Sequence, residues 1–199
     1  MSGDPGTDLN IVKKGYRASM HAVISLLDET RSQALKELWS ELARHCGVHA
    51  LSTLVPFPHF SYQIAHHYNE KQILTRLEAI ARHTPPFQVM TGGLNLFTGS
   101  HPVLSIPLVR TMALSLLHQT IWQEISPLGG NVSLYYNEER WCPHITLAEH
   151  DLEKQSLSQI VSLLSERDFS WSMTINNLAV IWDTGTGQEV RYHFDLQQQ

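Results

Sequence analysis

Two five-residue segments of the chain, PHFSY and PHITL, repeat one pattern of residue types: proline, histidine, apolar, hydroxyl, apolar. The first places His59 two residues before Ser61, and the second places His144 two residues before Thr146. In a β-strand, residues i and i+2 lie on one face about 6.5 to 7 Å apart, so each histidine and its hydroxyl partner point the same way. The pattern therefore predicts one polar pair on each of two strands, with the apolar residues directed into the core.

Two histidines and two hydroxyl groups around one position suit acid-base catalysis on a phosphodiester. Histidine is the side chain that most readily exchanges protons near neutral pH. One neutral imidazole can take a proton from the attacking water or hydroxyl while the other, protonated, donates to the leaving oxygen, each contributing about 10²- to 10⁴-fold. Ser61 and Thr146 are expected to hold the nonbridging phosphate oxygens as charge develops. The residues alone do not assign which histidine is the acid and which is the base.

Neither a metal ion nor a cofactor is expected in this reaction. Proton donation to the leaving oxygen replaces Lewis-acid polarisation, and the sequence lacks the carboxylate clusters of a two-metal site. The adjacent His66 and His67 would face opposite ways in a strand, with no third ligand at a recognisable spacing. The sequence also contains no G-x-G-x-x-G or Walker A loop, so dinucleotide and P-loop chemistry have no support.

Four further residues are candidates for contacting a substrate. Gln63 follows Ser61 by two residues and is expected to share its face, with an ordinary polar strand residue as an equal alternative. Tyr135, Arg140 and Trp141 lie in the loop that enters the second motif. There an aromatic ring could stack on a base and an arginine could reach a phosphate. The alternative for these three is a solvated loop with partly buried aromatic side chains.

The elements that must position both motifs alternate between strands and helices. An apolar run over residues 20–27 predicts a strand, and apolar residues at helical spacing over 29–46 predict a helix that Gly47 ends. The same reasoning predicts strands over 59–65, 87–92, 94–98, 103–109, 144–148, 171–182 and 190–196. It predicts further helices over 73–81, 112–125 and 153–167. This succession indicates an α+β fold with an antiparallel or mixed sheet and helices on its outer face.

The charge balance excludes one class of function. The 199 residues carry 14 Lys plus Arg against 19 Asp plus Glu, a formal net charge of −5. This balance argues against a large, sequence-independent binder of duplexes, whereas a small anionic substrate or a nucleic-acid end is compatible with it.

A single unit without a membrane segment is the expected organisation. Residues 1–17 are expected to form a flexible arm, and residues 18–199 a single bilobal domain that is a monomer. No apolar run approaches the roughly 18 residues of a membrane helix, and the first residues lack the features of a secretory signal, so a cytoplasmic or nuclear location is expected. Cys46 and Cys142 form no disulfide framework and are expected to be reduced thiols.

On its two motifs the chain resembles the two-histidine phosphoesterase superfamily, which includes 2′-5′ RNA ligases and cyclic nucleotide phosphodiesterases. The signature of that family is a pair of His-x-Thr/Ser motifs flanked by apolar residues. Outside the motifs the resemblance, from residues 22–27 to 180–196, lies only in the order of elements. It implies a bilobal α+β fold with pseudo-twofold symmetry, one motif in each lobe, and sheets lining a central cleft.

The resemblance also implies a phosphoesterase that acts on 2′,3′-cyclic phosphates, 2′-5′ linkages or related esters of a nucleotide or RNA end. His59 and His144 take the catalytic places of the family pattern, and Ser61 and Thr146 take the phosphate-binding places. Ser61 departs from the commoner threonine but keeps the hydroxyl. Two other functions stay open: an RNA- or nucleotide-binding module without turnover, and RNA end joining, which the same groups could catalyse by microscopic reversibility.

Overall fold

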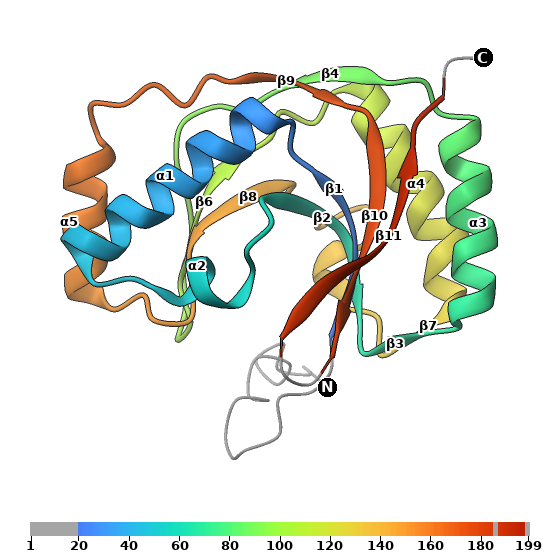
Figure 1. Cartoon of the computed structure of the whole chain (residues 1–199), viewed down its shortest axis with the longest axis horizontal. Helices are drawn as coiled ribbons and strands as arrows, with labels where there is room; N and C mark the ends of the chain where they lie inside the picture. The colour runs from blue at the N-terminus through green and yellow to red at the C-terminus, as the bar shows by residue number, and fades with distance from the viewer. Residues whose placement is uncertain (1–19, 185–186, 198–199) are drawn as a thin grey trace, which may run out of the picture.

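A seven-stranded sheet, antiparallel between all neighbours, organises the molecule (Figure 1). The computed structural model describes residues 20–184 and 187–197, so the arm expected over residues 1–17 lies outside the described residues. In spatial order the strands are β11 (Gln188–Asp195), β10 (Asn177–Asp183), β1 (His21–Leu26), β2 (His59–Ala65), β8 (His144–Ala148), β6 (Val103–Pro107) and β5 (Asn95–Phe97). Two small ladders pair β3 (His67–Tyr68) with β7 (Gly129–Gly130) and β4 (Phe87–Met90) with β9 (Ser172–Ile175).

Helices begin and end where the local sequence provides caps. The four long ones are α1 (Glu29–Cys46), α3 (Glu70–Arg82), α4 (Met112–Ile125) and α5 (Lys154–Leu164). Within the part of the chain that the structure describes, the short helical segments are α2 (Ala50–Leu54), η3 (Ser126–Leu128) and η4 (Leu134–Tyr136). The side chains of Asp28, Asn69 and Thr111 each accept a hydrogen bond from a backbone N–H in the first turn of α1, α3 and α4. Gly47 ends α1 in the left-handed conformation at φ 68°.

The chain repeats one order of elements in its two halves. The first half runs β1, α1, β2, α3, β4, and the second runs β6, α4, β8, α5, β9. Strands β2 and β8 meet at the centre of the sheet, and β4 pairs with β9. The helices are exchanged between the halves, because α1 packs against α5 and β8 while α4 packs against α3 and β2 (Figure 1). This is the pseudo-twofold arrangement that the family resemblance implies.

One hydrophobic core runs through both halves. It contains buried side chains from all four long helices and from the helix-facing side of the strands, including Phe60 of β2 and Ile145 of β8. A smaller apolar cluster lies on the other face of the sheet and consists of Ala22, Ile24, Ala179 and Ile181. The predicted α+β class is confirmed, and the sheet is antiparallel rather than mixed.

One strand prediction differs from the structure. The segment 171–182, expected as one strand, is divided into β9 and β10, which belong to different sheets. Strand β4 pairs with β9 from the second half of the chain, and Thr91, the residue after β4, bridges to Leu108, the residue after β6. No helix in the described ranges is long and apolar enough to cross a lipid bilayer.

Candidate functional site

The two motifs lie on β2 and β8, which are neighbours in the middle of the seven-stranded sheet. Phe60 pairs with Ile145 across them, and both side chains are buried in the core beneath the helices. Because side chains alternate along a strand, the histidine and the hydroxyl residue of each motif point to the opposite face. Four partly exposed side chains therefore share that face: His59, Ser61, His144 and Thr146. The structure brings together the four residues that the motifs predicted.

The two histidine rings are held in the same way. Nδ1 of His59 lies 2.8 Å from the carbonyl oxygen of Phe57, and Nδ1 of His144 lies 2.7 Å from that of Cys142. A carbonyl oxygen only accepts, so Nδ1 carries the hydrogen in both rings. Nε2 is then the atom that gains or loses a proton, which is the arrangement a general acid-base pair needs. A carbonyl two residues before the histidine is thus a feature of both motifs that sequence analysis missed.

An aromatic ring stands beside each histidine. The ring centroids of Phe57 and His59 are 6.0 Å apart, and those of Phe97 and His144 are 4.8 Å apart. Phe57 precedes His59 by two residues, so strand periodicity could have found it. Phe97 comes from β5, and no local pattern connects it with the second motif.

The two histidines differ in their electrostatic surroundings. Burial lowers the pKa of His59 to about 4, against the hydrogen bond to the Phe57 carbonyl, and a positive charge on His144 lowers it further. Burial also lowers the pKa of His144, but the Cys142 carbonyl and the Glu149 carboxylate act in the opposite direction. The environment therefore lowers the pKa of both histidines, and at His144 a carboxylate opposes the effect of burial. Glu149 is the residue after β8 and was not singled out from the sequence.

A β-bulge in β2 changes the side-chain direction after the first motif. Ser61 pairs with Ile24 of β1, but the next matched pair is Gln63 with Val23, so Tyr62 is the extra residue. Val23 lies in the core beneath the helices, and its partner Gln63 faces the same way.

Gln63 is a buried structural residue rather than a substrate contact. Its side chain is 0% exposed, donates to the Ser126 hydroxyl at 2.7 Å and accepts from the Tyr68 hydroxyl at 3.1 Å. The prediction that Gln63 shares the face of Ser61 is wrong, because the bulge at Tyr62 turns it to the other side of the sheet.

Trp141 is also buried, at 2% exposure. Its ring stacks on His118, with centroids 3.8 Å apart and an interplanar angle of 4°, and on Tyr62 at 5.7 Å. Its indole N–H donates to the carbonyl oxygen of Ser61 at 2.9 Å. The prediction that Trp141 stacks on a substrate base is wrong, because protein side chains already cover the ring.

Tyr135 and Arg140 remain exposed on the loop that leads to β8. The backbone N–H of Arg140 donates to the Asn137 side chain, which fixes the loop near its tip. Their contact with a substrate stays a prediction.

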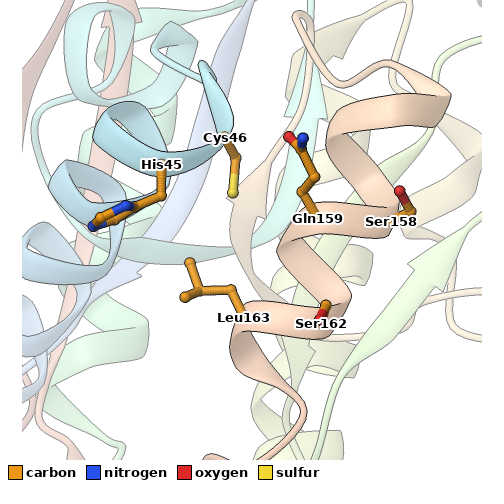
Figure 2. Close-up of a pocket in the computed structure, with 6 residues that line it drawn as sticks. All are labelled: His45, Cys46, Ser158, Gln159, Ser162 and Leu163. Atoms are coloured by element: carbon orange, nitrogen blue, oxygen red, sulfur yellow. The ribbon is translucent and has the colours of Figure 1, made fainter.

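A separate surface hollow of about 520 Å³ lies between α1 and α5 (Figure 2). It is lined by His45, Cys46, Ser158, Gln159, Ser162 and Leu163. These residues belong to neither motif, so the paired histidines and this hollow are different features. Within residues 20–184 and 187–197, no group of three or more His, Cys, Asp or Glu side chains is arranged to hold a metal ion.

Comparison with known families gives a match that covers most of the chain. The sequence profile described as the 2′-5′ RNA ligase superfamily matches residues 28–187. The matched region contains both motifs. A comparison with curated proteins finds no significant match.

Solved structures with a similar fold cover nearly the whole chain at low sequence identity. The crystal structure of TT0787 from Thermus thermophilus has a TM-score of 0.63 at 17% identity, covering 90% of this chain and 99% of that one. E. coli LigT complexed with 3′-AMP has a TM-score of 0.58 at 12% identity, covering 90% and 99%. A crystal structure described as a phosphoesterase has a TM-score of 0.56 at 13% identity, covering 91% and 99%. At these identities the likeness shows the fold.

Proposed function

The chain belongs to the 2′-5′ RNA ligase superfamily of phosphoesterases, and we propose that it cleaves a 2′,3′-cyclic phosphate or a 2′-5′ phosphodiester of a nucleotide or RNA end. The observation that carries this proposal is the matched pair of hydrogen bonds from Nδ1 of His59 and His144 to backbone carbonyls. They leave two Nε2 atoms on one face of the sheet, so that a proton acceptor and a proton donor can act on the same phosphate.

Each of the two histidine rings carries out one proton transfer in the reaction. Nε2 of His59 takes a proton from water as the water oxygen attacks phosphorus, and the bond from phosphorus to one ribose oxygen breaks. Nε2–H of His144 gives its proton to that oxygen as it leaves. Solvent then removes the proton from His59 and returns one to His144.

The roles follow from charge. Glu149 opposes the burial that lowers the pKa of His144, which suits that ring to be the general acid of the pair, whereas the pKa of His59 at about 4 keeps that ring neutral and suits a general base. Ser61 and Thr146 share the histidine face and donate hydrogen bonds to the nonbridging oxygens, whose negative charge grows in the transition state. No step in this scheme requires a metal ion.

Two observations support a nucleotide as the substrate. E. coli LigT, which shares the fold, was crystallised with 3′-AMP. In this chain the rings of Phe57 and Phe97 stand beside the histidines, where apolar surface can pack against a ribose or a base.

The test is turnover of 2′,3′-cyclic nucleotides and of short RNAs with 2′-5′ linkages or cyclic-phosphate ends, in the presence of EDTA. We expect wild type to cleave at least one of them, and His59→Ala and His144→Ala to lose at least about 10²-fold in rate. His83→Ala is the matched control, because His83 is exposed on the C-terminal end of α3 and its Nδ1 also bonds a backbone carbonyl, that of Ala79.

Other outcomes would identify the alternatives. Tight binding of an oligonucleotide without product would favour a binding module. Joining of RNA ends would favour the reverse reaction. Wild-type activity that survives in both histidine variants would contradict the two-histidine mechanism.

A further inference from the structure

Each motif strand receives a hydrogen bond from a buried tryptophan. The indole N–H of Trp141 donates to the carbonyl oxygen of Ser61 at 2.9 Å. The indole N–H of Trp39 donates to the carbonyl oxygen of Thr146 at 3.2 Å. The two acceptors are the hydroxyl-bearing residues of the two motifs, so they are equivalent under the pseudo-twofold symmetry, although the donors lie on different elements, α1 and the loop before β8.

These carbonyls lie at the seam between β2 and β8, where the two strands share few ladder pairs. Among the described residues, β2 and β8 share one matched pair, Phe60 with Ile145, whereas β2 pairs with β1 along its whole length. The carbonyl of Pro58 accepts from the residue after β1, and the carbonyl of Pro143 accepts from the residue after β6. Carbonyl direction alternates along a strand, so the carbonyls three residues later, those of the two hydroxyl residues, point into the seam between β2 and β8.

Both tryptophans are fixed by their own packing. Trp39 lies on α1 at 6% exposure, within the main core. Trp141 stacks on both His118 and Tyr62, and the Arg110 guanidinium lies 5.6 Å from its ring centroid. A rigid donor can hold a strand that lacks ladder partners, because little side-chain freedom remains to be lost.

The tryptophans also connect the halves reciprocally. Trp39 precedes the first motif in the chain but supports the second, and Trp141 precedes the second but supports the first. Each phosphate-binding position is therefore set by a residue from the other half.

We propose that Trp39 and Trp141 are positioning residues, whose indole N–H groups hold Thr146 and Ser61 so that both hydroxyls point at one phosphate. This inference rests on the phosphate-binding roles given to those hydroxyls in the proposed function. A buried carbonyl without its donor draws the strand toward another partner and turns the hydroxyl away.

Trp39→Phe and Trp141→Phe remove the N–H while keeping an aromatic ring in the core. The readout is the dissociation constant for adenosine 3′-phosphate, measured by calorimetry, so that it does not depend on turnover. We expect each variant to weaken binding about five-fold, the effect of one lost hydrogen bond. Trp171→Phe is the control, because Trp171 packs against the same core but contacts Arg31 and Phe169 instead of a motif strand. Equal affinities in all four proteins would overturn the inference.

Double-mutant cycles separate positioning from a general loss of packing. Trp141→Phe should be non-additive with Ser61→Ala and additive with Thr146→Ala, because without its hydroxyl Ser61 has nothing to position. Trp39→Phe should show the reverse selectivity. Coupling that does not follow these pairs would contradict the proposal.

Hydrogen exchange of the wild-type indole N–H groups supplies a measurement that needs no variant. We expect adenosine 3′-phosphate to slow exchange at Trp39 and Trp141 and to leave that of Trp171 unchanged; uniform slowing of all three would refute the inference. If wild type binds the nucleotide but cleaves nothing, the proposed catalysis fails while the affinity cycles still decide this inference. If wild type does not bind it, both fail.

Discussion

His118 should make the folded protein sensitive to mild acid. The ring is 1% exposed, stacks on Trp141 and bonds the Tyr136 carbonyl through Nε2 at 2.9 Å. Burial lowers the pKa of His118 from 6.5 to about 4, although the hydrogen bond to that carbonyl acts to raise it. Since the folded pKa lies below the unfolded one, protonation favours unfolding. The stability that depends on a neutral ring is intact above pH 6.5 and is lost as the pH falls toward 4.

The size of the effect follows from the two pKa values. A difference of about 2.5 corresponds to about 3 kcal/mol of unfolding free energy, fully lost only at or below pH 4. This loss of unfolding free energy can be measured by urea unfolding of wild type and His118→Phe at intervals between pH 4 and 8, with tryptophan fluorescence as the signal. Phenylalanine keeps a ring against Trp141 but does not titrate, so the wild-type curve should fall below pH 6.5 more steeply than that of the variant.

The control is His83→Phe, because His83 is exposed at the end of α3 and its replacement should leave the pH dependence unchanged. Parallel curves for wild type and His118→Phe would refute the reasoning, since the buried ring would then be charged in the folded protein without cost.

Three further outcomes are expected. The pH profile of kcat/KM should be bell-shaped, and Glu149→Gln should move its alkaline limb to lower pH by lowering the pKa of His144. Glu139→Gln, on an exposed loop, should leave that limb in place. An alkaline limb that does not move in Glu149→Gln would show that Glu149 has no part in the mechanism. Ser61→Ala and Thr146→Ala should each lower kcat/KM about 10²-fold, with activity retained in Ser61→Thr; wild-type rates in the alanine variants would exclude phosphate binding by these hydroxyls. Gln63→Leu should lower the free energy of unfolding by about 1–3 kcal/mol, because Ser126 and the buried Tyr68 lose their hydrogen bonds to it. Urea unfolding together with nucleotide affinity would show whether the loss is structural alone.

Local patterns predicted the motif strands well. The alternation around Phe60 and Ile145 placed the two histidines on one face, because the period of a strand is fixed by its backbone. Most helix boundaries were also predicted from local sequence, because capping residues and Gly47 act on the helical turn beside them.

The prediction for Gln63 failed because a single bulge reverses the alternation. Which residue is extra depends on the register between β2 and β1, which are separated by α1 and α2 in the chain. The prediction that Trp141 contacts the substrate failed for a related reason, because its stacking partners His118 and Tyr62 come from other elements.

The sequence by itself determined the paired His-x-Ser and His-x-Thr motifs, the α+β class and the side of each strand that the motif residues occupy. All of these depend on residue type and on a period of a few residues. Only the tertiary structure decided that Phe97 and Glu149 accompany the second histidine, that Gln63 is buried, and that Trp39 supports Thr146. Those relations depend on strand register and helix exchange between the halves, which are set by packing of the whole core and leave no periodic trace in the chain.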